Sequence, residues 1–169
     1  MSPLTIEAYR DAMARLSAAV NVITTDGPAG RGGFTASAVC SVTDRPPTLL
    51  VCQNRASRQH AVFAENGVLC VNTLGPGHET ISSMFAGVGD VPLAERFPEA
   101  HWTSLTTGAP ALREAIVSFD CRITDRRDVS THTVLFCEVV DLRVRPEAPG
   151  LVYFRRVYRT VDVALDPPA

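Results

Sequence analysis

The sequence has no apolar run of membrane-spanning length and no signal peptide, so we expect a cytoplasmic protein without membrane contact. It also lacks a basic excess. Lys and Arg total 16 against 18 for Asp and Glu, and the net charge of -2 argues against nucleic-acid binding. The five cysteines form no CxxC pair and occupy apolar runs, at Cys40, Cys52, Cys70, Cys121 and Cys137. Buried free thiols in a reducing compartment therefore fit better than disulfides or a zinc site.

Several catalytic signatures are missing as well. The chain contains no GxGxxG, no P-loop, no HExxH and no Gly-x-Ser-x-Gly. Its histidines are scattered without metal-ligand spacing, at His60, His78, His101 and His132. We therefore expect no metal site, and no pair of nucleophile and base stands out.

What the sequence does contain is strands. At 169 residues, 46% apolar and 20% charged, it suits one globular domain over residues 1–169. Residues 115–124 alternate between apolar and polar side chains, which is typical of a half-buried strand. About seven strands with few helices, mostly joined by short turns, predict a mainly β fold, an antiparallel barrel or sandwich.

The expected elements follow the chain in order. We expect helices over 5–18, 57–65 and 78–85, and a long surface loop over 86–102 that could serve as a lid. The expected strands are 20–25, 35–41, 48–52, 68–73, 115–124, 133–144, 151–153 and 157–161, with a turn at 125–128.

The most informative stretch runs from Gly32 to Arg58. Small and hydroxyl side chains begin at Thr35 on its first strand, and small side chains let a flat group lie close to the backbone. The polar cluster at residues 53–58 could bind a phosphorylated group. An ordinary β-hairpin with a polar tip has the same features, and His132, at the start of a later strand, could equally be a simple rim histidine. This inventory suits a protein that holds a cofactor, which performs the reaction itself.

Several motifs in order resemble the short-chain NAD(P)H:flavin reductases, the reductase components of two-component monooxygenases of the 4-hydroxyphenylacetate type. Residues 33–42 (GFTASAVCSV) resemble the signature strand of that family, and residues 46–55 (PPTLLVCQNR) its next strand. Further matches are 66–72 (NGVLCVN), 85–87 (FAG), 95–97 (ERF), 107–112 (TGAPAL) and 118–121 (SFDC). The resemblance covers nearly the whole chain, from Tyr9 to Tyr158.

This resemblance implies an FMN-binding split barrel, a Greek-key antiparallel β-barrel that forms a homodimer. It implies FAD or FMN as the flavin and NADH or NADPH as co-substrate. By position, Thr35, Ala36, Ser37 and Ser41 would lie along the flavin ring. The ribityl–phosphate end would be held by Asn54, Arg55 and Ser57, and closed over by Ser82, Phe85 and Ala86. His132 would be the catalytic-site residue that meets the nicotinamide.

The implied reaction is hydride transfer from NAD(P)H to the flavin, which then leaves as freely diffusing reduced flavin for a partner flavin-dependent monooxygenase. Three positions depart from the pattern of the family. Met84 replaces a basic residue, and Ser130 and Cys137 replace glycines. Loss of the cation at Met84 is consistent with moderate flavin affinity. Two alternatives stay open: a flavoprotein with tightly bound FMN, similar to pyridoxamine-phosphate oxidase, and a non-enzymatic flavin or haem carrier on the same barrel.

Overall fold

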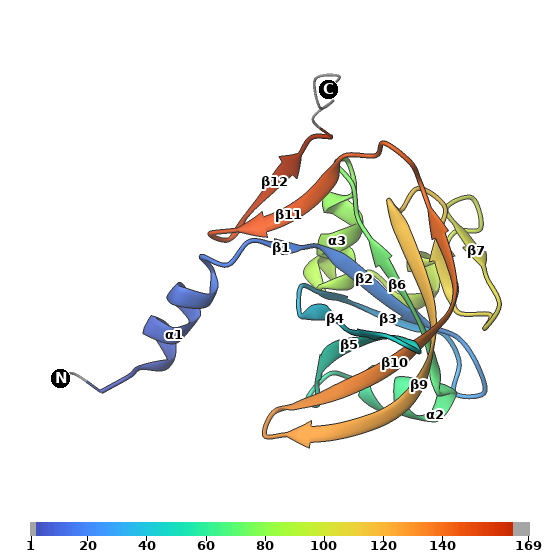
Figure 1. The fold of residues 1–169 in the computed structure, drawn as a ribbon, viewed down its shortest axis with the longest axis horizontal. Coiled ribbons are helices and arrows are strands. Elements are labelled where there is room, and N and C mark those ends of the chain that lie inside the picture. Colours follow the sequence, from blue (N-terminus) through green and yellow to red (C-terminus); the bar gives the residue numbers. More distant parts are fainter. Residues whose placement is uncertain (1–2, 164–169) are drawn as a thin grey trace.

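The structure, a computed structural model, describes residues 3–163 of the chain. Its main feature is an antiparallel sheet of seven strands in the order β3-β2-β6-β9-β10-β5-β4 (Figure 1). These strands are β2 (Asn21–Thr25), β3 (Gly32–Ala36), β4 (Val39–Asp44), β5 (Pro47–Asn54), β6 (Val68–Thr73), β9 (Val117–Val129) and β10 (His132–Val144). The expected mainly β, antiparallel fold is therefore confirmed.

The remaining elements surround this sheet. Three short strands form a second sheet, β1 (Ala18–Ala19), β11 (Gly150–Phe154) and β12 (Val157–Val161), and β7 (Trp102–Ser104) pairs with β8 (Pro110–Leu112). The helices are α1 (Ile6–Met13), α2 (His60–Asn66), α3 (Glu79–Phe85) and the 3-10 turns η1 (Val88–Asp90) and η2 (Leu93–Arg96). None of the helices within residues 3–163 is long and apolar enough to cross a membrane.

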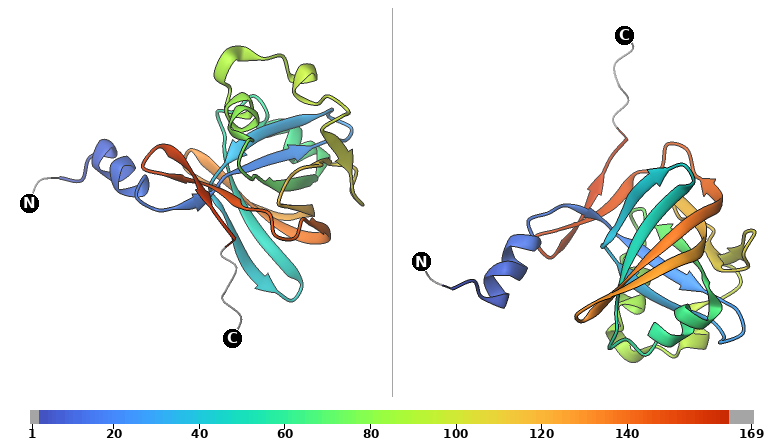
Figure 2. Two further views of the ribbon diagram at one scale, coloured as in Figure 1. Left: turned by 90° about the horizontal axis from the view of Figure 1, so that it is seen from above. Right: turned by 60° about the horizontal axis from the view of Figure 1, so that its bottom comes forward.

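The curled sheet is split between its two outer strands, β3 and β4 (Figure 2). The single strand expected over 35–41 is wrong, because the chain bends between β3 and β4. There the N–H of Val39 donates to the carbonyl of Ser37 at 3.0 Å, and the N–H of Cys52 donates to the carbonyl of Ala38 at 3.1 Å. Small side chains permit this bend, and it carries the chain from one edge of the sheet to the other.

The two larger apolar clusters hold the barrel together. One fills its interior and includes Ile23, Val51 and Leu135, which the alternation of the strands directs inward, and Phe63 of α2. The other lies beside α3 and joins Phe85, Phe97 and Trp102, whose rings are 5.0–5.7 Å apart. The loop expected over 86–102 is therefore not a loose lid, because its own aromatic residues are anchored in the core.

Other expectations need correction. β9 continues through 125–128, and the turn comes at Ser130, whose φ of 50° is left-handed. The polar face expected on this strand is covered at Ser118 and Asp120, both 0% exposed, because the segment before β8 packs over it. The backbone N–H of Thr107 donates to the Asp120 carboxylate at 2.6 Å. Among the cysteines, Cys40 is exposed.

The first helix is shorter than the expected 5–18 and stands apart from the barrel (Figures 1 and 2). The hydroxyl of Thr5 caps it by accepting from the N–H of Ala8 at 3.1 Å. None of its residues is buried. Its C-terminal end is fixed by the β11–β12 turn, where Arg156 pairs with Asp11 at 2.6 Å.

Candidate functional site

A cavity of about 280 Å³ lies in the split of the barrel. β3, β5, α3 and the start of β10 all contribute to its wall. It brings together most of the residues that the resemblance singled out, namely Thr35, Ala36, Ser37, Asn54, Ser57, Phe85, Ala86 and His132. These residues are far apart in the sequence, and the antiparallel pairing of β5 with β10 places Asn54 opposite His132.

The wall formed by β3 is thin because its residues are small. A Cβ built on Gly33 would lie 2.5 Å from the ring of Phe85, so the helix packs against this strand only with glycine there. The hydroxyl of Thr35 donates to the carbonyl of Ser82 at 2.6 Å. These two contacts fix α3 against the edge strand and thereby set the width of the cavity.

A second cavity of about 260 Å³ lies on the other side of the same small residues. It shares Thr35, Ala36, Ser37 and Ala86 with the first, so the two are neighbours along β3. Ser82 lines only this second cavity, together with Tyr153 and Tyr158. Tyr158 donates its hydroxyl hydrogen to Ser82 Oγ at 2.9 Å.

Sequence reasoning missed these two tyrosines. Their rings are tilted against each other at 5.2 Å, and both belong to the β11–β12 hairpin. Nothing in the local pattern of residues 150–161 connects them with β3, because only tertiary packing brings the two segments together.

Gln53 is a further residue whose role the sequence did not single out. Gln53 borders both the split cavity and a neighbouring cavity that His60 and Thr133 also line, and it is 1% exposed. Neither atom of its side-chain amide has a hydrogen-bond partner among residues 3–163. Buried polar atoms are rarely left unpaired, so a ligand or water is expected there. The sequence contained a sign of this buried amide, because Gln53 is a polar residue in the same inward register as Leu49 and Val51.

Arg55 does not line the split cavity, although its neighbour Asn54 does. Its Nη1 donates to the carbonyl of Ser130 at 3.2 Å, and its Nη2 lies 3.5 Å from a carboxylate oxygen of Asp128. The guanidinium is therefore directed toward the tip of the β9–β10 hairpin. His132 belongs to the same tip, where its Nδ1 lies 2.9 Å from the hydroxyl of Thr131.

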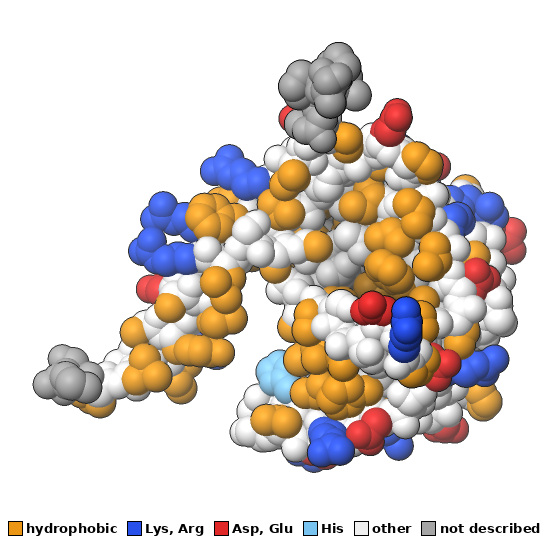
Figure 3. All heavy atoms as spheres, in the orientation of Figure 1, with side chains coloured by type: hydrophobic (Ala, Val, Ile, Leu, Met, Phe, Trp, Pro, Cys, Tyr) orange, Lys and Arg blue, Asp and Glu red, His pale blue; other side chains and the backbone are white. Residues whose placement is uncertain are grey.

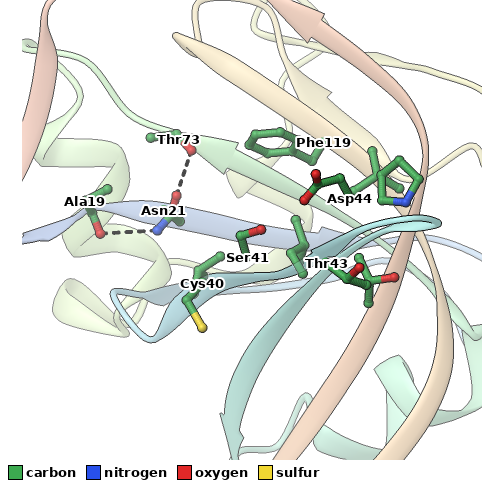
Figure 4. Close-up of a pocket in the computed structure, with 13 residues that line it drawn as sticks. Ala19, Asn21, Cys40, Ser41, Thr43, Asp44, Thr73 and Phe119 are labelled. Carbon is green, nitrogen blue, oxygen red and sulfur yellow. Dashed lines mark hydrogen bonds between the residues drawn. The ribbon is translucent and has the colours of Figure 1, made fainter.

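Ser41 lies apart from the split cavity. It lines a different, larger cavity of about 420 Å³, together with Asn21, Thr73 and Phe119 (Figure 4). In that wall the hydroxyl of Thr73 donates to Asn21 Oδ1 at 2.8 Å. The bend between β3 and β4 separates Ser41 from Thr35, which a continuous strand would have kept on one surface.

The split cavity suits a flat ring with a hydrogen-bonding edge, as in a flavin. Within the described part of the chain β3 pairs with β2 alone, so backbone N–H and C=O groups along its other edge are open to a ligand. The small side chains of Thr35, Ala36 and Ser37 leave room for the ring beside that edge. Among residues 3–163 no cluster of three or more His, Cys, Asp or Glu side chains offers a metal site.

Comparisons with known proteins agree with this geometry. The family model described as "Flavin reductase like domain" matches residues 13–162. The chain is 58% identical over 152 residues to FMN reductase (NADH) RutF of Pantoea ananatis, which covers 90% of this chain and 79% of that protein. A crystal structure of a proposed flavin reductase from Haemophilus somnus superposes with a TM-score of 0.89 at 47% identity, over 94% of this chain and 100% of that one.

A more distant structure shows the same fold. BorF, the flavin reductase component of a bacterial two-component tryptophan halogenase, has a TM-score of 0.88 at 22% identity, over 94% of this chain and 99% of that one. At this identity the likeness concerns the barrel alone.

Proposed function

Because this chain belongs to the flavin reductase-like family, we propose that it is an NADH-dependent FMN reductase. Membership of the family makes it an NAD(P)H-dependent flavin reductase, and the name of its relative in Pantoea ananatis, FMN reductase (NADH), supports a preference for NADH and FMN. The observation that carries the proposal is the split cavity, where an open strand edge and small side chains meet the polar residues Asn54 and His132.

A bound flavin would supply the redox chemistry by accepting a hydride from the nicotinamide, so the protein needs no nucleophile of its own. The role of the chain is to hold two flat rings in register, and alignment of this kind can lower a barrier by about 7–11 kcal/mol. In this proposal the edge from Thr35 to Ser37 lies along the flavin ring. Asn54 and Ser57 hold the ribityl chain, and His132 orients the nicotinamide.

The product would be reduced flavin that leaves for a flavin-dependent oxygenase. A diffusible product requires moderate affinity, and Met84 at the end of α3 offers no positive charge to the flavin phosphate. The motifs of residues 33–42 and 46–55, which resemble the reductase components of two-component monooxygenases, support a partner of the oxygenase class. FAD is a second candidate substrate, because the family resemblance implies either flavin.

We also infer a homodimer, with α1 as part of the interface. The helix is eight residues long, and isolated helices of this length are not stable in water. Its apolar residues Ile6, Tyr9 and Met13 are 65%, 55% and 45% exposed. Figure 3 shows apolar side chains gathered on this helix and a gap between the helix and the barrel. A second copy could fill that gap and cover an apolar surface of a size that rarely stays in water.

The test of the proposed function is an NADH and NADPH oxidation assay with FMN and FAD added separately. We expect oxidation of NADH that depends on added FMN, and a flavin that is lost during gel filtration. Flavin retained through gel filtration would favour an enzyme similar to pyridoxamine-phosphate oxidase. Absence of oxidation with either flavin would favour a flavin carrier.

A matched pair of variants shows whether the split cavity is the site. Ala36→Leu narrows the split cavity, and we expect the FMN-dependent oxidation of NADH to be lost. Thr43→Leu makes a similar change in the separate cavity on β4 and should leave the activity intact. Equal activity in the two variants would mean that the flavin binds elsewhere.

A further inference from the structure

The strongest unexplained feature near the site is the orientation of Arg55. It follows Asn54 at the end of β5, where a cation could meet the phosphate of a ligand in the split cavity. Its guanidinium is engaged instead with the β9–β10 tip, through the carbonyl of Ser130 at 3.2 Å and the carboxylate of Asp128 at 3.5 Å. The backbone N–H of Arg55 is fixed to the same tip, by a bond to the carbonyl of Thr131 at 3.0 Å.

Asp128 is itself held in position to make this contact. The hydroxyl of Thr133 donates to its Oδ1 at 2.6 Å, and this leaves Oδ2 toward Arg55. The hydrogen bond from Thr133, and then the nearby charges of Arg55 and His60, lower the pKa of Asp128. The carboxylate therefore stays ionised at neutral pH and competes with any other anion for Arg55.

The pair is nevertheless easy to open. The side chains of Arg55 and Asp128 are 47% and 57% exposed, and exposed ion pairs contribute little to stability. A phosphate group carries nearly two negative charges and can accept two parallel hydrogen bonds from a guanidinium. A flavin phosphate can therefore replace Asp128, but its affinity is reduced by the contact that must be broken.

We propose that Asp128 is an affinity-setting residue that holds Arg55 away from the flavin phosphate and so keeps flavin binding loose. This inference rests on the proposed function, because it takes the phosphate of FMN as the competing anion. It also links the two ends of the site, since Arg55 and His132 are both attached to the same hairpin tip.

The test measures flavin binding without NADH, by titration of flavin fluorescence or by calorimetry. FMN is compared with riboflavin, which has the same ring and no phosphate. In Asp128→Asn we expect the Kd for FMN to fall about two- to fivefold, the range for release of an exposed ion pair, with the Kd for riboflavin unchanged. The amide oxygen of Asn can still accept from Thr133, so the hairpin should stay folded.

Asp125→Asn is the matched control. Asp125 lies on the same strand, is similarly exposed and pairs with Arg127 at 3.2 Å, so its substitution changes the net charge equally. We expect no change in the Kd for FMN. Equal tightening in both variants would reduce the effect to net charge and overturn the inference. If Asp128→Asn fails to fold, Asp128→Ser removes the same charge and serves in its place.

Arg55→Met separates this inference from the proposed function. Arg55→Met should raise the Kd for FMN toward the Kd for riboflavin. When Asp128→Asn is added to Arg55→Met, the Kd for FMN should not change further. If Arg55→Met weakens FMN binding but Asp128→Asn does not tighten it, Arg55 still contacts the phosphate and only the role of Asp128 is overturned. If Arg55→Met leaves FMN binding unchanged, Arg55 does not contact the phosphate and the inference is overturned, while the oxidation assay still decides the proposed function.

Discussion

The hydroxyl of Thr35 donates a hydrogen bond to the backbone carbonyl of Ser82 at 2.6 Å. Thr35 belongs to the outer strand β3 and Ser82 to α3, so this bond joins the two walls of the split cavity. The side chain of Ser82 is connected onward to Tyr158 of the β11–β12 hairpin. One threonine therefore links three segments that meet only in the folded chain.

Thr35→Val should disturb this link while preserving the shape of the side chain. We expect a loss of about 0.5–1.5 kcal/mol in the free energy of unfolding, the usual worth of one hydrogen bond, and a higher Kd for FMN. Thr35→Ser keeps the hydroxyl and should behave like the natural protein in both respects. Chemical denaturation and FMN titration measure the two effects, and unchanged FMN binding in Thr35→Val would remove this residue from the site.

His132→Ala should affect the nicotinamide more than the chemical step. We expect the KM for NADH to rise roughly three- to tenfold, as for loss of one hydrogen bond, with a smaller fall in kcat. His101→Ala is the control, because His101 is exposed and does not line the split cavity. If His132→Ala abolished turnover at an unchanged KM, the residue would be part of the chemistry and its proposed orienting role would be wrong.

The proposed dimer depends on the apolar side of α1. Met13→Glu places a charge there, and we expect the protein to change from dimer to monomer in light scattering at matched concentration. Ala8→Glu adds the same charge on the opposite side of the helix and should leave the dimer intact. A natural protein that is monomeric, or a dimer insensitive to Met13→Glu, would contradict the role given to this helix.

Stability should fall on mild acidification because of His78. Burial, and then the charge of Arg145, lower the pKa of this histidine below its ordinary value of 6.5. Between the lowered and the ordinary pKa, the unfolded chain binds more protons than the folded one, so the free energy of unfolding decreases as pH falls below 6.5. The ring accepts a hydrogen bond from Gly75 through Nδ1 at 3.3 Å.

The measurement for His78 is urea denaturation from about pH 7.5 to about pH 5.5, a range in which few other side chains titrate. His78→Asn keeps an acceptor for the N–H of Gly75 but cannot titrate. Its free energy of unfolding should vary less over this range than that of the natural protein. Parallel curves for the two proteins would show that His78 is free to protonate in the folded state.

The sequence alone determined those helices, strands and turns whose formation depends on neighbouring residues. Apolar runs predicted the strands over 48–52 and 68–73, and turn residues ended the elements, as at Gly67, whose φ of 67° follows α2. The ordered motifs determined the family. They also identified residues that the fold brings together, because a motif near Thr35 and another near Asn54 record a cavity shared by both.

Only the tertiary structure decided how those elements meet. The bend after Ala36 moved Ser41 into a separate cavity, and the packing of the segment around Thr107 covered Asp120 on a face that had been expected to meet water. Arg55 lies where the motif predicts, yet the hairpin tip decides the direction of its side chain. Local preference acts over a few neighbouring residues, whereas burial and charge pairing depend on which distant segments are brought into contact.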